Sequence, residues 1–508
     1  MPRLAPVTMA ALPFSSTCID LFPLARLTAA SLAMGSSLRQ QGKPRGRGRA
    51  THQPAESETV MTASNATAEL ADYVLSVRPS DLPPPVVREG LRSFVNILGC
   101  MLSGSRHAGF AIAERAFEPF AGKPEATVIG RRKRTDAMTA GLLNCLSSSI
   151  NTYDDTHAQA IIHASGPVAA AALALAERQK VAGADFLTAF TLGVEAACRV
   201  SMAVSVPPAK GSIAWSQTGI CCGIGAAVAA GKLMALNAHE LRRAIGIAAC
   251  QAAGIRAMHG TMCTALMPAQ AAQAGLRAAV LAAQGFTSSE ASLEHRYGFV
   301  ACFAEAGNPQ AIAGGLGRHF EILANTYKPY PCGIVIHPMI DAALQLRRQN
   351  GLEPPAIDKI AIRANPAALA LCDRPAPKDE FEAQVSLQHW VAAALVRGRA
   401  GIAEGSQESV RDGAIAALRG RVQVSADANV APDATHLALA LSDGRSLACG
   451  IEHALGSKHR PMSDADLTAK FEQLAEGSLA PKAAKDLAAE CWRLADLPDA
   501  GALARAAA

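Results

Sequence analysis

Residues 153–178 of this chain read YDDTHAQAIIHASGPVAAAALALAER, and they join two kinds of sequence. The first half crowds ionisable and hydroxyl groups into a short polar loop. The second half, after Gly166 and Pro167, is an alanine- and leucine-rich run with high helix propensity. Proline suits the first turn of a helix because its missing N–H would have no intrahelical partner there. We therefore expect a polar loop that leads into the N-terminus of a buried helix, where free N–H groups attract carboxylates.

The length and charge of the chain bound the class of protein. Its 508 residues are too many for one ordinary hydrophobic core, so two domains are expected. Seven of the 48 lysines and arginines and three of the 43 acidic residues lie in residues 1–60, which leaves 41 bases against 40 acids elsewhere. A body so close to neutral offers no case for a nucleic-acid surface.

The 13 cysteines are odd in number and scattered, and no CxxC motif occurs. This usage is typical of a reducing compartment, in which cysteine serves as a small apolar residue. We therefore expect a cytoplasmic protein with no cofactor and without a cysteine-ligated zinc or iron–sulfur site.

Residues 1–60 lack the pattern of a folded domain. They contain the polar, basic stretch GKPRGRGRATHQPAE, whose composition is typical of disorder. A transit peptide would have a similar excess of arginine over acid. We instead interpret the segment as a misassigned start, because Met61 opens a stretch that looks like a natural protein beginning, and we predict that residues 1–60 are dispensable.

Helical periodicity dominates most of the remaining chain and is interrupted once. Helices are predicted at 86–104, 135–150, 182–204, 239–253 and 268–284, and strands at 357–363, 422–425, 436–441 and 446–451. We therefore predict a mainly α protein with an inserted α+β domain. A large helical domain would contain 64–320 and 460–505, and a smaller α+β lid domain would contain 321–457.

Small residues recur at four-residue spacing at Gly219, Gly223, Ala227 and Gly231. In a membrane this pattern would indicate helix dimerisation, but the uncharged run before Lys232 is too short to span a bilayer. We expect a closely packed helix in a core, and no membrane association.

The loop at 153–178 also resembles the signature of the MmgE/PrpD family, which includes 2-methylcitrate dehydratase, iminodisuccinate epimerase and cis-aconitate decarboxylase. Three later stretches resemble further signatures of that family: TYKPYPCGIVIHPMIDAAL at 326–344, AQVSLQHWVAAALVRG at 383–398 and IEHALGSKHRPMSDADLTAKF at 451–471. The resemblance covers nearly all of residues 64–505. It implies a helical domain built from both ends of the chain, an inserted α+β domain, an active site between the two, and a homodimer.

The resemblance also implies site residues. Asp155, Thr156 and His163 match the family's loop, and Lys328 matches the second signature, with His337 downstream. Other positions depart from the family's motifs. Thr152 stands where an Asp is usual, Ser216 where a His is frequent, and Thr264 and Met267 where a Lys and a His are usual. His389 occupies the place of a common Tyr.

The family's reactions on di- and tricarboxylates share one step, in which a base removes a proton next to a carboxylate while cations or N–H dipoles hold the negative charge. We assign the proton transfer to His163, its orientation to Asp155 and Thr156, and a second acid–base role to His389. Substrate binding is assigned to Lys328, Asp154 and His337. The predicted enzyme is a lyase or isomerase, 2-methylcitrate dehydratase-like, that acts on a small polycarboxylate without a metal.

Each assignment has an alternative that the residues leave open. His163 and His389 could be hydrogen-bonded core histidines, the two aspartates could cap the following helix, and Lys328 could be a solvated charge. Asp154, Asp155, His157 and His163 could together bind a divalent metal, although their spacing matches no strong ligand motif. The departures from the motifs also allow a carboxylate-binding or relic protein that keeps the fold without the chemistry.

Overall fold

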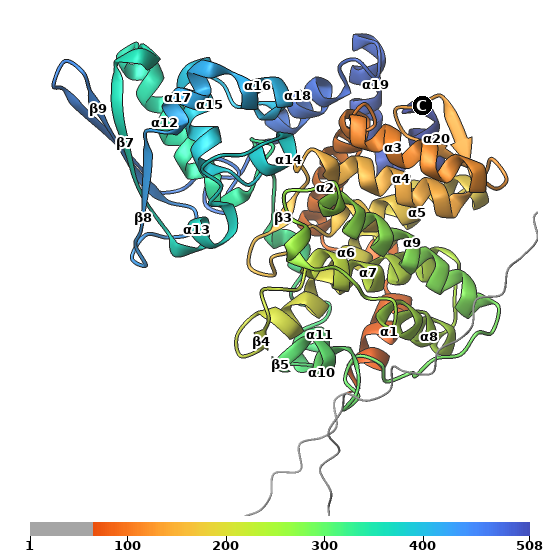
Figure 1. The fold of residues 1–508 in the computed structure, drawn as a ribbon. Helices are drawn as coiled ribbons and strands as arrows, with labels where there is room; N and C mark the ends of the chain where they lie inside the picture. Colours follow the sequence, from red (N-terminus) through yellow and green to blue (C-terminus); the bar gives the residue numbers. More distant parts are fainter. Residues whose placement is uncertain (1–64) are drawn as a thin grey trace, which may run out of the picture. The chain divides into compact units, whose positions relative to one another are not determined.

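The computed structural model describes residues 65–508, and it confirms the predicted mainly α fold with a smaller α+β part (Figure 1). The predictions about residues 1–60 lie outside the described residues. Between residues 65 and 320 the described structure has eleven α-helices: α1 (Ala66–Ser76), α2 (Pro84–Gly104), α3 (Ala108–Phe117), α4 (Ala137–Ile150), α5 (Ser165–Gln179), α6 (Gly183–Ser205), α7 (Gln217–Leu233), α8 (Ala238–Ala249), α9 (Cys263–Ala283), α10 (Phe299–Phe303) and α11 (Gln310–Ala313).

Helix α7 lies at the centre of this helical part and packs against α5, α6, α8 and α9. Its small residues permit the close approach that the four-residue spacing predicts. A Cβ added at Gly219 would lie 2.5 Å from the carbonyl oxygen of Ala253, and one added at Gly231 would lie 2.7 Å from a methyl group of Leu241 in α8. Only glycine leaves room for these neighbours, and the contacts confirm close packing in the core.

Helix α6 is long and apolar enough to cross a membrane by length and composition alone. However, 94% of its apolar window is buried inside the protein, where Phe186 and Phe190 pack edge-on against Phe94 of α2. Its apolar surface is therefore already covered by other helices of the same chain.

A second hydrophobic core belongs to the α+β part, in which helices α12 (His337–Asn350) and α15 (Leu387–Arg397) accompany a four-stranded sheet. The strand order is β10-β9-β7-β8, and only β7 and β8 run parallel. Strand β9 buries every second residue, as period-two alternation predicts for a sheet with one covered face. The strands are β7 (Ile357–Ala364), β8 (Val422–Ala426), β9 (Thr435–Leu441) and β10 (Ser446–Ile451), with the short helices α13 (Pro366–Cys372), α14 (Glu380–Ala383), α16 (Gln407–Arg411) and α17 (Gly413–Arg419).

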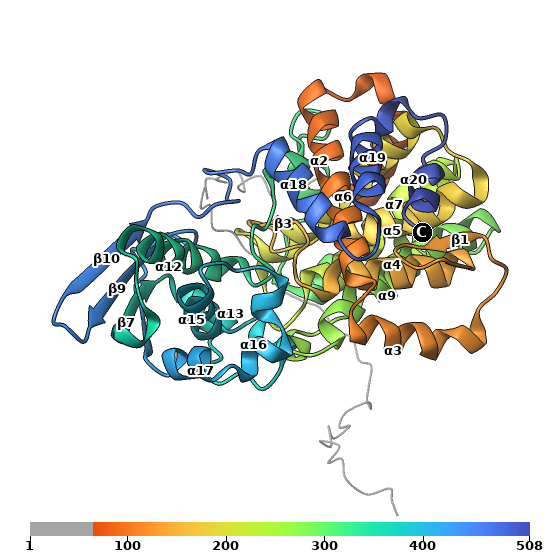
Figure 2. The same cartoon turned by 90° about the horizontal axis from the view of Figure 1, so that it is seen from above.

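The chain then returns to the first core. Helices α18 (Asp464–Ala475) and α19 (Pro481–Trp492) pack on α2, and α20 (Gly501–Ala506) packs on α5 (Figure 2). Phe471 and Leu474 are buried in the same cluster as the N-terminal helices. The domain boundaries drawn from the sequence stay predictions.

Three two-stranded ladders complete the described structure: β1 (Ala126–Val128) with β2 (Lys133–Thr135), β4 (Lys210–Gly211) with β5 (Ala304–Ala306), and β3 (Thr156–His157) with β6 (Asn325–Thr326). The last of these matters for the site. It joins the polar loop after α4 to a segment more than 160 residues further along the chain.

Candidate active site

The polar loop between α4 and α5 is held in place by a short antiparallel ladder. Thr156 pairs with Thr326, whose side-chain hydroxyl donates to the Thr156 carbonyl oxygen over 2.6 Å. Lys328 follows this ladder by two residues. The pairing therefore brings Lys328 to the loop that carries His163, as the family resemblance implies.

His163 is the most accessible of the predicted loop residues, with 34% of its side chain exposed. Its Nδ1 lies 2.8 Å from the carbonyl oxygen of Asp155 and 3.0 Å from the hydroxyl of Thr156. A carbonyl oxygen can only accept a hydrogen bond, so Nδ1 carries the proton and Nε2 keeps its lone pair. Burial lowers the pKa of His163, and Lys328 and Arg256 act in the same direction against the attraction of Asp154. The neutral imidazole, the form that can act as a base, is therefore favoured near neutral pH.

Asp154 and Lys328 form an ion pair within the protein. Lys328 Nζ donates to Asp154 Oδ1 over 3.0 Å and to the Thr152 carbonyl oxygen over 3.1 Å, and only 2% of the lysine side chain is exposed. Burial alone would raise the pKa of Asp154, but Lys328 and His163 hold it below its ordinary value. The aspartate is therefore ionised and its charge is matched by the lysine.

Thr152 occupies the left-handed region of the backbone map at φ +51°, which a β-branched residue rarely adopts. Its hydroxyl donates to the side-chain oxygen of Gln384, and the Gln384 amide donates to the Ile150 carbonyl oxygen. These contacts, with the bond from Lys328, hold the strained residue. The position where the family motif has an acid thus connects the loop to the α+β part.

Asp155 differs from its neighbour in its charge state. Burial raises its pKa to about 6, although hydrogen bonds from Asn325 and Ser165 oppose the increase. Both hydrogen bonds reach Oδ2, and the buried Oδ1 has no partner among the described residues. Because Ser165 is the first residue of α5, the start of that helix faces this protein carboxyl group. Asp155 can change its protonation state close to neutral pH.

Lys470 of α18 is a buried residue that sequence reasoning missed. Its ammonium group donates to Asn96 Oδ1 and to the Lys328 carbonyl oxygen over 2.8 Å each, and to the Tyr153 carbonyl oxygen over 2.9 Å. It also lies 3.9 Å from the centre of the Tyr153 ring. Burial lowers the pKa of Lys470 to about 8, so it remains protonated at pH 7 and uses all three donors. The residue stood in a quoted signature, but nothing in the sequence places it behind the loop.

The two other predicted histidines are both buried. Burial lowers the pKa of His337 to about 3, with a further decrease from Lys328, and its Nε2 has no partner among the described residues. His389 lies in the α+β part, where Nε2 donates to the Glu404 carbonyl oxygen over 2.8 Å and Nδ1 faces Arg419 at 3.5 Å. No described contact joins His389 to the loop residues. The structure therefore brings together Asp154, Asp155, Thr156, His163 and Lys328, with His337 beside them, and its contacts do not bring His389 there.

A second segment that sequence reasoning missed lies beside His163. Arg256 and His259 stand in and after a 3₁₀ turn, Arg256–Met258, that precedes α9. Burial lowers the pKa of His259 to about 4, and the charges of Arg256 and His163 lower it further. In this region the family motif has a Lys and a His, and this chain has neither at those positions. Of their substitutes, Thr264 donates to the Met258 carbonyl oxygen over 3.0 Å, and Met267 is buried.

The fourth departure, Ser216, has a structural contact. Its hydroxyl accepts a hydrogen bond from the Gly219 N–H and caps α7. The next residues of this helix, Gln217 and Thr218, contact Arg256 and His163 respectively.

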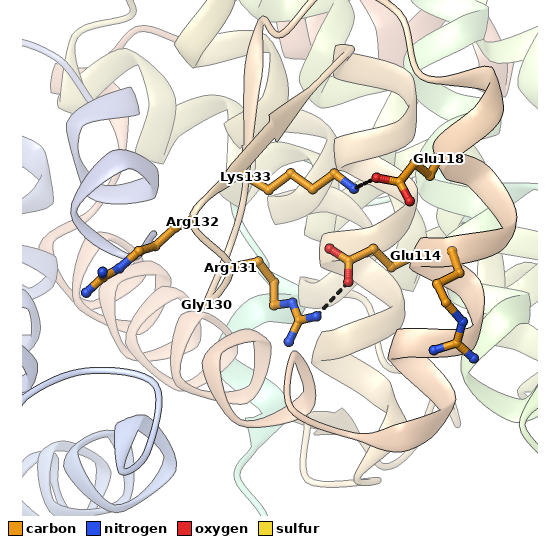
Figure 3. Close-up of a pocket in the computed structure, with 7 residues that line it drawn as sticks. Glu114, Glu118, Gly130, Arg131, Arg132 and Lys133 are labelled. Carbon is orange, nitrogen blue, oxygen red and sulfur yellow. Dashed lines mark hydrogen bonds and ion pairs between the residues drawn. The ribbon is translucent and has the colours of Figure 1, made fainter.

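Across residues 65–508, no three His, Cys, Asp or Glu side chains are placed to hold one metal ion. Of the four residues considered for a metal, His157 lies against Glu321, with Nε2 3.1 Å from the carboxylate. A surface pocket of about 470 Å³ lies elsewhere, beside α3 and the β1–β2 turn (Figure 3). Arg131 pairs with Glu114 and Lys133 with Glu118 in that pocket, and none of the predicted site residues lines it.

The described residues combine a helical part with an α+β part. A buried aspartate–lysine pair lies beside a partly exposed histidine, an arrangement typical of an enzyme active site. The MmgE/PrpD N-terminal domain matches residues 68–311, and the MmgE/PrpD C-terminal domain matches residues 330–494. The chain belongs to the MmgE/PrpD family.

Several curated relatives are similar to the chain at low identity. The cis-aconitate decarboxylase of Aspergillus terreus is 25% identical and that of Mus musculus is also 25% identical; each match covers 88% of this chain and 96% or 94% of the relative. A cis-aconitate decarboxylase-like protein, oryM, of Aspergillus oryzae is 28% identical over 56% of this chain and 62% of its own length. The similarities support a lyase-type function on carboxylates and leave the substrate and mechanism open.

Proposed function

We propose that this chain is a lyase or isomerase that moves a proton at a carbon next to a carboxylate of a small di- or tricarboxylate. The observation that carries the proposal is the orientation of His163. Its Nδ1 is bound to the Asp155 carbonyl oxygen and the Thr156 hydroxyl, so the lone pair of Nε2 remains for a ligand. A third of the side chain is exposed, which gives a substrate access to it.

Proton abstraction next to a carboxylate creates negative charge, which a fixed cation stabilises. Lys328 and Arg256 both lie close enough to His163 to lower its pKa, so their fields reach the reacting position. Asp155, with a pKa near 6 and a buried carboxyl group, can change the charge behind the loop near neutral pH. We propose that His163 acts as the base and that Thr156 and the Asp155 backbone orient it.

Three reaction types use these groups differently. Dehydration needs an acid for the departing hydroxyl, epimerisation needs a proton returned to the opposite face, and decarboxylation needs a proton delivered to the carbon that loses CO₂. The names of the relatives make cis-aconitate the first substrate to test, and the family resemblance makes 2-methylcitrate the second. We also propose a homodimer and metal-independent chemistry, in line with the family resemblance.

The first experiment is a thermal-shift screen of the full chain with citrate, 2-methylcitrate, cis-aconitate and an iminodisuccinate-like acid. A ligand that binds only the folded protein raises its melting temperature in proportion to RT ln(1 + [L]/Kd). We expect a shift with polycarboxylates and none with a monocarboxylate such as acetate. If no polycarboxylate shifts the transition, the relic alternative replaces this proposal.

With a substrate in hand, His163→Ala should lower kcat by at least ~10²-fold, the usual contribution of a general base. His239→Ala is the matched control, because His239 lies on the surface of α8 and contacts only Glu290 among the described residues. Retained activity in His163→Ala would contradict the assignment. So would activity that is lost with EDTA and restored by a divalent metal.

A further inference from the structure

Arg256 carries a positive charge that no acidic side chain of residues 65–508 neutralises. Its Nε donates to the Trp215 carbonyl oxygen over 3.1 Å, and its Nη2 donates to the Gln217 side-chain oxygen over 2.7 Å. Both acceptors are neutral, and Nη1 has no hydrogen-bond partner in the described part of the chain. The side chain is partly buried and burial lowers its pKa, yet a guanidinium stays charged in proteins. A partly buried cation without a counter-charge is unfavourable unless an anion joins it.

The backbone fixes this guanidinium next to the candidate base. The Arg256 N–H donates to the Ala214 carbonyl oxygen over 2.8 Å, so the residue is tied to the chain just before α7. Gln217, which holds the guanidinium, is the first residue of α7, and the hydroxyl of the next residue, Thr218, accepts a hydrogen bond from the His163 N–H over 3.1 Å. Adjacent residues of one helix end therefore position Arg256 and His163.

Lys328, the cation that was predicted from the sequence to bind substrate, has an acidic partner, whereas Arg256 has none among the described residues. Its charge is matched by Asp154 at 3.0 Å, and its side chain is almost completely buried. A matched charge attracts an incoming carboxylate much less than an unmatched one. Of these two cations beside His163, Arg256 is thus the one with free charge.

We propose that Arg256 binds one carboxylate of the substrate, at a distance from the carboxylate next to the reacting carbon, and so selects acids with at least two carboxylates. The inference rests on the proposed function and deepens it. Guanidinium and carboxylate are both planar and can form two parallel hydrogen bonds, a geometry that a lysine ammonium cannot reproduce. Nη1 is the free donor that begins such a contact.

The test measures binding by calorimetry at pH 7.5 with tricarballylate, a saturated tricarboxylate without a double bond or hydroxyl group. Four full-length proteins are compared: wild type, Arg256→Gln, Arg256→Lys and Arg277→Gln. Arg277→Gln is the matched control, since this exposed guanidinium also donates to a glutamine side-chain oxygen, that of Gln251. Arg277 lines a pocket whose lining contains neither Arg256 nor His163.

We expect Arg256→Gln to raise the Kd for tricarballylate at least ~10-fold, the size of a lost charge-assisted contact. Arg256→Lys should recover part of the affinity, and Arg277→Gln should bind within about twofold of wild type. The melting temperature of each protein without ligand shows whether a loss of binding comes from unfolding.

Three negative outcomes are distinguishable. If wild type and Arg256→Gln bind tricarballylate equally well, Arg256 is not the carboxylate site and the proposed function stands. If wild type binds neither tricarballylate nor any acid of the thermal-shift screen, the proposed function fails and this inference fails with it. An equal loss in Arg256→Gln and Arg277→Gln would show a general charge effect and would also overturn the assignment.

Discussion

The ionisable residues around the candidate site form two groups with opposite properties. The buried group contains Asp154, Lys328 and Lys470, whose charges are paired or satisfied by three acceptors within the protein. The exposed group contains His163, Arg256 and His259, which are only partly buried and have no acidic partner closer than the 3.8 Å between His163 and Asp154.

This difference separates the work of the two groups. A buried ion pair whose partners are fixed leaves little free charge for a ligand. Removing one partner leaves the other charge in a low-dielectric environment without its counter-charge. A cation with only neutral partners keeps its field available. We therefore interpret the buried group as the support that orders the loop, and the exposed group as the part that contacts substrate.

The largest expected effect is on stability and comes from breaking the buried pair. Lys328→Met leaves the ionised Asp154 carboxylate buried without its counter-charge, and we expect a loss of about 3–5 kcal/mol in unfolding free energy. Urea denaturation of the full chain measures it. The control is the double variant Asp154→Asn/Lys328→Met, which removes both charges and should lose clearly less than the single variant. A loss below about 1 kcal/mol in Lys328→Met would mean that the pair does not support the loop.

The sequence predicts the buried group in part. YDDTH stood out as a polar stretch, TYKPYP entered as part of the second family signature, and the family resemblance joined them. Their physical meeting depends on the β3–β6 ladder, which is two residues long on each side and too short to show a strand pattern. Lys470 could not be predicted as a partner because helical periodicity places it on a face of α18 but cannot say which carbonyl groups face that helix.

The exposed group was largely missed, for a local reason. Helix α9 was predicted at 268–284, but it begins at Cys263 and contains Pro268. The segment before it was therefore examined only for absent motif residues. Arg256 gave no signal, because a single arginine in a loop is normally solvated. Only its tertiary contacts with Trp215 and Gln217 set it beside His163.

The fold class needed less information. Period-two alternation predicted strand β7, and helical periodicity predicted the helices of the first core. These patterns depend on local burial alone, whereas the site depends on which distant segments meet. His389 illustrates the limit: its helix was predicted correctly, but its burial between Glu404 and Arg419 could not be. Its acid–base role stays a prediction.

A second prediction uses the contrast between the neighbouring carboxyl groups. The pKa of Asp155 in the folded protein is about 6, above the ordinary 3.8, so its protonated form stabilises the fold. That contribution is complete below about pH 3.8 and is lost as the pH rises through 6. Asp155→Asn has no such group. Its unfolding free energy relative to wild type should therefore rise by about 2 kcal/mol between pH 4 and pH 7.5.

Urea denaturation at both pH values measures this difference. A pH-dependent change in unfolding free energy that both proteins share, such as that from Asp154, cancels in the comparison. A difference that is independent of pH would show that Asp155 is ionised like its neighbour. In that case the division between the two aspartates would be wrong.

The smallest expected effect comes from an ion pair at the surface, which tests whether burial decides the outcome. Arg131 donates to Glu114 over 2.7 Å, a shorter distance than between Lys328 and Asp154, but 38% of the arginine side chain is exposed. Water screens this pair, and its guanidinium lies 5.8 Å from the centre of the Phe110 ring, at the outer limit of a cation–π contact. Arg131→Gln should therefore cost about 1 kcal/mol or less, with a loss that shrinks further in 0.5 M salt because screening weakens exposed pairs. A loss equal to that of Lys328→Met would mean that the short distance between the charges, and not their burial, determines how much an ion pair stabilises this protein. The division of the site residues into a supporting group and a substrate-binding group would then be wrong.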